Sequence, residues 1–229
     1  MPATSKSSLT RLLLITIGAW GTDKLNDPQF MFTLFPLWWG ISPTFAPLSD
    51  EEKLGVDKST HQFIETVRAI GSESAVSEEW TSLDGNFAKL ILCDQISRNC
   101  FRGTEEAFAY GSTALLSCRT ILADPEWRNL SCAAHAFLSS AYQHSEDAND
   151  HVQNQEVISN AIEKFGAKNG MVLELKKHCD DHKSVIDRFG RYPHRNEVLG
   201  RESTEEEKAY LSDIESLFNW EKSQVKKSI

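Results

Sequence analysis

Apolar residues recur at helical spacing along most of this chain, and this pattern constrains its fold more than any other feature. Phe63, Val67 and Ile70 lie three or four positions apart, as they would on one face of a helix. Three longer apolar-rich runs also have helical length, at residues 87–100, 113–122 and 132–142. Because the turn and alternation signals of β-hairpins are scarce, the pattern predicts an all-α protein.

Helix-ending residues stand where these runs stop. Pro125 follows one apolar run, and Gly166 and Gly170 bracket a short break further along the chain. Gly190 follows an aromatic residue, as glycine does at a helix C-terminus. These residues predict separate helices joined by short connections.

A capping box predicts the start of another helix near the C-terminus. Ser203 can accept a hydrogen bond from the N–H of Glu206, and the Glu206 side chain can return one to the N–H of Ser203. We expect the helix that follows to include residues 209–218.

Composition narrows the class of protein and its partners. The 229 residues are 40% hydrophobic and 25% charged, and no apolar run approaches the roughly 20 residues that cross a membrane. A net charge of −9 opposes nucleic-acid binding. Five scattered cysteines without a C-x-x-C pair are typical of reduced thiols. We therefore expect a cytoplasmic protein with neither a membrane nor a nucleic acid as partner.

We expect one helical domain between two tails. Residues 1–12 are predicted to be disordered, residues 13–220 to form the domain, and residues 221–229 to form a charged tail. Residues 32–47 contain three prolines, which exclude one regular helix, and five large aromatic residues, Phe32, Phe35, Trp38, Trp39 and Phe45. This segment predicts an aromatic loop packed on the helices.

The first of three polar clusters follows the apolar run at residues 87–93. Asp94, Arg98 and Arg102 are four residues apart, so a continuous helix would place all three on one face. They would then form a ladder of ion pairs. Such a ladder can serve a binding site or only fix the packing of the helix.

The second cluster crowds ionisable groups into two helical turns. His144, Asp147 and His151 would share one face of a helix, with Glu146 and Asp150 on the neighbouring face. Carboxylates packed so closely need raised pKa values, an arginine partner or a divalent cation. The alternative is a solvated acidic helix end.

The third cluster is basic within an acidic chain. Residues 188–201 carry four arginines and one glutamate, and two glycines and a proline predict a turn-rich loop. Guanidinium groups that converge in a loop can bind carboxylate or phosphate. The alternative is that these arginines pair with the carboxylates of the other two clusters.

These clusters resemble the motifs of the family called domain of unknown function 924. That family carries D-Q-x-x-R-N-x-x-R-G, H-S-E-D and R-F-G-R-[FY]-P-H-R-N-x-x-L-G-R-x-S-T, which this chain matches at residues 94–103, 144–147 and 188–204. The resemblance covers roughly residues 15–215. It implies an all-α fold similar to the superhelices of tetratricopeptide repeats, and it implies no settled activity.

The chain departs from the family pattern at two places. Ala46 stands where the family has an aspartate after its W-F…F block, and His151 stands where it has a glutamine. Both changes touch the expected polar centre, which suggests specialised chemistry in this member.

The E-D-x-x-D sequence of Glu146, Asp147 and Asp150 also resembles the aspartate-rich motif of class I terpene cyclases, which bind Mg²⁺ and a prenyl diphosphate. We therefore expect a Mg²⁺-dependent enzyme acting on a small phosphate or diphosphate, possible reactions being those of a lyase or cyclase. The expected metal ligands are Asp94, Glu146, Asp147 and Asp150. The expected anion-binding residues are Arg98, Arg102, Arg188, Arg191, Arg195 and Asn196. The expected catalytic residues are His144, His194, Arg191 and Arg195.

Two other functions fit the same residues. A superhelix of paired helices can present an arginine-rich groove to an acidic peptide without catalysis. The polar network can also be purely architectural. The expected distinction is geometric: carboxylates converging on an open cavity favour a metal enzyme, whereas carboxylates saturated by arginine contradict it.

Overall fold

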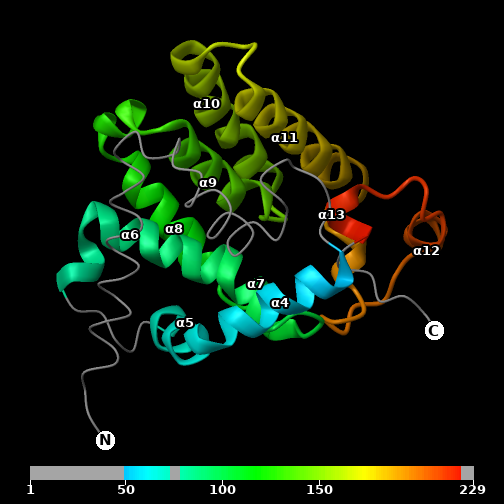
Figure 1. Cartoon of the computed structure of the whole chain (residues 1–229). Coiled ribbons are helices and arrows are strands. Elements are labelled where there is room, and N and C mark those ends of the chain that lie inside the picture. Colours follow the sequence, from blue (N-terminus) through cyan, green and yellow to red (C-terminus); the bar gives the residue numbers. More distant parts are fainter. Residues whose placement is uncertain (1–48, 73–77, 223–229) are drawn as a thin grey trace, which may run out of the picture.

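Helices account for all the regular secondary structure in the part of the chain that the computed structural model describes, residues 49–72 and 78–222 (Figure 1). The longer helices are α4 (Asp50–Thr60), α5 (Ile64–Gly71), α6 (Leu83–Ile91), α8 (Gly111–Leu122), α9 (Cys132–Gln143), α10 (Ala148–Phe165), α11 (Gly170–Phe189) and α12 (Glu205–Ser212). The predicted all-α fold class is confirmed.

Shorter helical pieces complete the connections. The two short α-helices are α7 (Ser97–Cys100) and α13 (Asn219–Lys222). Five 3₁₀ turns are η2 (His61–Phe63), η3 (Glu78–Thr81), η5 (Glu105–Ala107), η6 (Pro125–Asn129) and η7 (Pro193–Arg195). A π-helical turn, η4 (Leu92–Ile96), joins α6 directly to α7.

The core forms where consecutive helices pack together. Helix α6 packs on α8, and α9, α10 and α11 contact one another, with α10 and α11 lying side by side in Figure 1. The main apolar cluster takes Leu90 from α6 and Phe137 from α9. Phe63, Val67 and Ile70 are buried in the same cluster, as their helical spacing predicts. This packing of neighbours supplies the local helix pairs that the family resemblance implies.

The predicted helix ends are confirmed. Helix α8 ends shortly before Pro125, and α10 and α11 are separated by the break between Gly166 and Gly170. Gly190 caps α11 in the left-handed conformation, with φ of 69°. The absence of a Cβ makes this conformation accessible.

The predicted capping box is displaced by one residue. The N-cap is Thr204, whose hydroxyl accepts from the N–H of Glu207, while the Glu207 carboxylate accepts from the N–H of Thr204. Both registers contain a hydroxyl followed three residues later by glutamate, so the sequence alone does not choose between them. The helix that follows ends at Ser212 rather than continuing through residue 218.

The C-terminal boundary also differs from the prediction. Residue 221 was expected to begin a charged tail, but Glu221 belongs to α13 and is fully buried. Its carboxylate accepts hydrogen bonds from the Tyr210 hydroxyl at 2.6 Å and the Phe218 N–H at 3.1 Å. The helical domain therefore extends at least to Lys222. The expected N-terminal tail and the aromatic segment at residues 32–47 lie outside the described residues.

Two further expectations concern the membrane and the cysteines. No helix in the described part of the chain has both the length and the apolar character needed to cross a membrane. All five cysteines carry free thiols.

A substitution at Gly71 is expected to test the packing between α5 and the residues before α8. A Cβ at Gly71 would lie 2.0 Å from Tyr110 Cδ1, so Gly71→Ala requires the ring to move. We expect a loss of about 1–3 kcal/mol in the free energy of unfolding. Urea denaturation measures it, with Gly55→Ala as the control. No atom lies within 4 Å of a Cβ at Gly55, so the control is expected to be neutral or stabilising.

Candidate functional site

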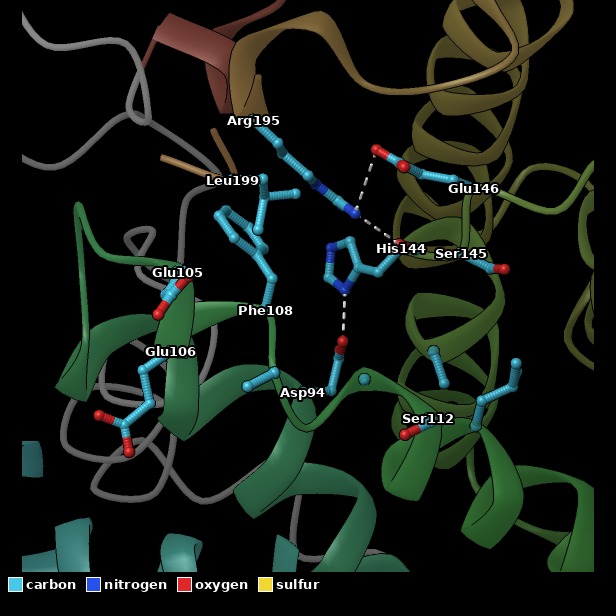
Figure 2. Close-up of a pocket in the computed structure, with 14 residues that line it drawn as sticks. Asp94, Glu105, Glu106, Phe108, Ser112, His144, Ser145, Glu146, Arg195 and Leu199 are labelled. Carbon is cyan, nitrogen blue, oxygen red and sulfur yellow. Dashed lines mark hydrogen bonds and ion pairs between the residues drawn. The ribbon is translucent and has the colours of Figure 1, made fainter. Parts of the chain in front are cut away.

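A cavity of about 690 Å³ lies where α8, α9 and the loop after α11 approach one another (Figure 2). Its volume lies within the range of small-molecule sites in proteins, about 300–1,000 Å³. The lining residues are Asp94, Glu105, Glu106, Phe108, Ala109, Gly111, Ser112, Leu115, Ala141, His144, Ser145, Glu146, Arg195 and Leu199. Residues from all three polar clusters of the sequence therefore meet at this cavity.

A buried carboxylate and an imidazole form its centre. His144 Nδ1 lies 2.6 Å from Asp94 Oδ1. Because an ionised carboxylate can only accept a hydrogen bond, the proton of neutral His144 resides on Nδ1. This leaves Nε2 with a free electron pair. Figure 2 shows that this edge of the ring faces away from Asp94, toward Phe108 and Arg195.

Asp94 is held rigidly by three more donors. Its Oδ2 accepts from Gln95 Nε2 at 2.6 Å and from Ser140 Oγ at 3.1 Å, while Arg98 Nη2 lies 3.3 Å from Oδ1. Asp94 is 1% exposed and sits in the π-helical turn η4. Such turns interrupt the regular α-helical register and are frequent at functional sites.

The electrostatics of the pair keep Asp94 ionised and His144 neutral at pH 7. Burial alone raises the pKa of Asp94, but His144, Arg98 and the hydrogen bonds outweigh it, and this pKa lies below its ordinary range. Burial and then Arg98 lower the pKa of His144 to about 4, against the opposite effect of Asp94. A neutral imidazole oriented by a carboxylate is the form that accepts a proton.

Arg195 supplies the positive charge of the cavity. Its side chain is 8% exposed, and its guanidinium lies over the rings of Tyr192 at 4.2 Å and Phe108 at 4.8 Å. Its Nη1 donates to the carbonyl oxygen of His144 at 3.0 Å. Burial and the nearby Arg98 lower the pKa of Arg195 to about 9, which still leaves the group charged at pH 7.

Glu146 joins the junction between α9 and α10 to the arginine-rich loop. Its carboxylate accepts from Arg201 Nη1 at 2.6 Å, from Arg201 Nη2 at 3.1 Å and from the Tyr192 N–H at 2.9 Å. Arg195 Nη1 is further away, at 3.8 Å. Glu146 is therefore paired mainly with Arg201, and among the described residues Arg195 has only this longer contact with a carboxylate.

The second cluster does not form the continuous helix that its spacing predicts. Helix α9 ends at Gln143, and α10 begins after Asp147, whose carboxylate caps the helix by accepting from the N–H of Asn149. The segment between them turns, and this turn directs His144 and Glu146 toward the cavity. Asp147 is a residue type that commonly caps the N-terminus of a helix, and its position explains why α10 begins here.

The structure does not bring the four predicted metal ligands together. Asp94 and Glu146 are engaged as described above, Asp147 caps α10, and Asp150 pairs with Arg119 at 2.5 Å. Ser145 donates a further hydrogen bond to Asp150. Within residues 49–72 and 78–222, no three His, Cys, Asp or Glu side chains are grouped to hold a metal ion. These carboxylates therefore do not fit a Mg²⁺ site.

Two of the predicted anion-binding arginines pair outside the cavity. Arg102 lies beyond the end of α7 and forms a forked ion pair with Asp57, so the predicted ladder stops at Arg98. Arg188 is exposed and pairs with Glu206 at 2.9 Å. Arg98 does not line the cavity itself. Its guanidinium lies over the Phe108 ring, 5.2 Å from the ring centre.

Arg191 and Asn196 hold the loop to α12. Arg191 donates through Nε and Nη2 to Glu207 at 2.7 and 2.8 Å. Asn196 donates to Ser203 at 3.0 Å and to Glu207 at 3.3 Å. The predicted catalytic role of Arg191 therefore has no support from its position. The alternative, pairing of the loop arginines with carboxylates of the other two clusters, describes Arg201, which pairs with Glu146, but not Arg191, whose partner Glu207 lies outside both clusters.

His194 is also away from the cavity lining. It is buried against Trp220, with ring centres 5.4 Å apart, and its Nδ1 lies 3.6 Å from Glu221 Oε1. Of the four predicted catalytic residues, His144 and Arg195 are the two that meet at the cavity. Which residues of the loop after α11 reach the cavity depends on which side of the loop faces inward, and sequence spacing does not show this.

Several cavity residues were not predicted from the sequence. Phe108, Ser112, Leu115 and Leu199 form walls, and Glu105 and Glu106 contribute from η5. Glu106 is paired with Arg68 at 2.7 and 2.9 Å. Leu199 belongs to the third family motif, whereas the other five lie in no recognisable pattern, although η5 follows the Arg102-Gly103 end of the first cluster closely.

Buried histidines make the protein sensitive to acid. Burial lowers the pKa of His194, like that of His144, to about 4. The unfolded chain, with ordinary histidine pKa values near 6.5, binds more protons between pH 6.5 and 4, so stability falls as pH falls through this window. We expect a loss on the order of 3 kcal/mol from pH 7 to pH 5, measured by urea unfolding. His194→Gln should reduce this loss, and His61→Gln, a control at an exposed histidine, should not. A free energy of unfolding that does not change between pH 7 and pH 5 would contradict the prediction.

Comparisons with known proteins agree with this description. The chain matches the family described as "Bacterial protein of unknown function (DUF924)" over residues 48–215. Its fold is similar to the solved structure of a protein of unknown function from Agrobacterium tumefaciens, with a TM-score of 0.62 and 24% identity over 90% of this chain and 98% of that one. A search of curated proteins found no match. The family match covers most of the chain and contains all three polar clusters, and the chain therefore belongs to the DUF924 family.

Proposed function

We propose that this protein is an enzyme that uses His144 as a general base on a small molecule held through an anionic group at Arg195. The observation that carries the proposal is the 2.6 Å hydrogen bond between His144 and Asp94, which turns the opposite edge of the imidazole toward Arg195 at a large cavity. A buried carboxylate fixes the tautomer and orientation of the ring, as in other His–Asp pairs.

The proposed chemistry begins with one proton transfer. His144 Nε2 accepts a proton from an O–H or C–H group of the substrate or from an attacking water molecule, and Asp94 stabilises the imidazolium that forms. The imidazolium then exchanges its proton with water and delivers a proton to the leaving or product atom. Arg195 holds the anionic group in place and stabilises negative charge that develops nearby.

The proposal keeps the small anionic substrate expected from the sequence and gives no role to Mg²⁺. Each of the four carboxylates expected to bind the metal already has a cationic, hydroxyl or N–H partner. The aromatic residues expected to surround a prenyl chain lie outside the described residues. A diphosphate lyase or cyclase therefore has less support than general-base catalysis.

A binding module for an acidic peptide is the second candidate. Arg195 could equally hold a peptide carboxylate, and this role needs no base. What favours the enzyme is the orientation of His144, because a rigid, desolvated His–Asp pair costs stability and adds nothing to simple anion binding. The two candidates differ in what His144 does.

Isotopic water tests the proposal for any substrate that is attacked by water or loses a C–H proton. The protein is incubated with a bacterial small-molecule extract in H₂¹⁸O and separately in D₂O, and products are identified by mass spectrometry. Hydrolysis incorporates ¹⁸O and proton abstraction incorporates deuterium. We expect label in at least one compound with the native protein and none above background with His144→Asn. Equal labelling by both proteins contradicts the proposal.

A further inference from the structure

We propose that the group held at Arg195 is a carboxylate and that the ligand is a small carboxylic acid with an apolar body. This inference rests on the proposed function and adds the chemical class of its substrate. It is carried by the charge balance around the cavity, the incomplete hydrogen bonding of Arg195 and the apolar walls.

The charge balance leaves room for one negative charge. Three guanidinium groups, of Arg98, Arg195 and Arg201, lie among two carboxylates, of Asp94 and Glu146. His144 adds no charge, since burial lowers its pKa to about 4. One positive charge is therefore in excess. A carboxylate neutralises it, whereas a phosphate dianion would leave a net negative charge beside the buried carboxylate of Asp94 and the half-buried carboxylate of Glu146.

The acidic residues of η5 do not supply that missing charge. Glu106 is neutralised by its two hydrogen bonds from Arg68. Glu105 is exposed, so water screens its charge. The charge balance at the cavity centre therefore depends on the three arginines and the two carboxylates of Asp94 and Glu146.

Arg195 also has unused hydrogen-bonding capacity. Nη1 donates to the His144 carbonyl, while the buried Nε has no hydrogen-bond partner in the described part of the chain. Leaving buried N–H groups unpaired costs stability, so an added acceptor is favourable. A planar carboxylate can accept two parallel N–H bonds from one guanidinium.

The rest of the cavity is suited to an apolar body. Phe108, Leu115, Ala141 and Leu199 present apolar surface among the lining residues. Burial of such surface against a ligand contributes roughly 25 cal/mol per Å². Because Arg195 donates to the His144 backbone, a carboxylate bound at Arg195 brings the adjoining atoms of the ligand close to the imidazole. The reacting atom is thus expected near the carboxylate.

Three probes of matched shape test the ligand class: 4-phenylbutyrate, the neutral 4-phenylbutyramide and 3-phenylpropyl phosphate. Isothermal titration calorimetry of the full chain at pH 7.5 measures the Kd of each. We expect 4-phenylbutyrate to bind at least 10-fold more tightly than either other probe. The inference is overturned if the phosphate binds as tightly as the carboxylate, or if the amide does.

Two arginine variants locate the binding. Arg195→Gln is expected to weaken 4-phenylbutyrate binding at least 10-fold, and Arg188→Gln, at an exposed arginine outside the cavity, should change it less than 2-fold. If Arg195→Gln does not fold, Arg195→Lys retains the charge without the planar fork and should still weaken binding several-fold. Unchanged binding in a folded Arg195 variant overturns the inference.

The same probes separate this inference from the proposed function. A carboxylate preference without any isotopic labelling would contradict the enzyme but support the ligand class. Labelling that depends on His144, together with a preference for the phosphate probe, would support the enzyme and overturn the ligand class.

Discussion

Replacing His144 by asparagine is expected to lower the turnover number by about 100-fold or more, the usual contribution of a general base. The asparagine amide can occupy the place of Nδ1–H and donate to Asp94, so the variant removes the base while preserving its hydrogen bond. Turnover is measured on the compound that acquires isotope from labelled water.

His178→Asn is the matched control for this variant. His178 lies on α11, outside the cavity lining, and its ring is 6.4 Å from that of His182. We expect its turnover to stay within 2-fold of the native value. A His144→Asn protein that turns over as fast as the control would show that His144 is not the base, and partial recovery with added imidazole would support its role.

Replacing Asp94 by alanine is expected to cost about 3–5 kcal/mol in the free energy of unfolding, because it leaves Arg98 partly buried without its carboxylate. The change also removes the acceptor of Gln95, Ser140 and His144. Urea denaturation at pH 7 measures this loss.

Asp187→Ala gives the comparison for a pair with the same spacing. Asp187 pairs with Lys183 one helical turn away, and both side chains are far more exposed than Asp94, at 54% and 35%. An exposed pair of this kind contributes at most about 1 kcal/mol. If Asp94→Ala and Asp187→Ala lower the free energy of unfolding equally, the burial of the Asp94 network does not account for the larger loss predicted for Asp94→Ala.

The fold could be predicted from the sequence because its signals are local. Apolar spacing marks Phe63, Val67 and Ile70 as one buried face, and Gly190 ends α11 because it can adopt a positive φ. Such signals act within one or two helical turns. The capping box failed by one residue, since Ser203 and Thr204 offer equivalent hydroxyls to successive glutamates.

The site could be predicted only in part, because its geometry depends on contacts between distant residues. The sequence identifies His144, Asp94 and Arg195 as polar residues among apolar ones. It does not show that Asp94 and His144, which are 50 residues apart, share a hydrogen bond. It also treats residues 144–151 as one helix, whereas a turn separates α9 from α10 there. The metal site predicted from the E-D-x-x-D sequence is not formed either, because Glu146, Asp147 and Asp150 each have a different partner.

The arginines show why residue type alone overestimates a binding site. Arg102, Arg188 and Arg191 each have a carboxylate partner outside the cavity, at Asp57, Glu206 and Glu207. Only the fold reveals these partners, because each pair joins different elements. Arg195 is distinct in being buried, in being stacked on two aromatic rings and, among the described residues, in having only a longer contact with a carboxylate.

The protonation state of His144 tests the central claim most directly, and it requires no substrate. Two-dimensional ¹H–¹⁵N NMR of the ¹⁵N-labelled protein reports which ring nitrogen carries a proton, with His144→Asn identifying the signals. At pH 7 we predict a neutral ring protonated on Nδ1, an unprotonated Nε2, and a shift of the Nε2 resonance when 4-phenylbutyrate is added. A ring protonated on Nε2 or on both nitrogens at pH 7 would contradict the account, because such a ring has no electron pair to offer at the cavity.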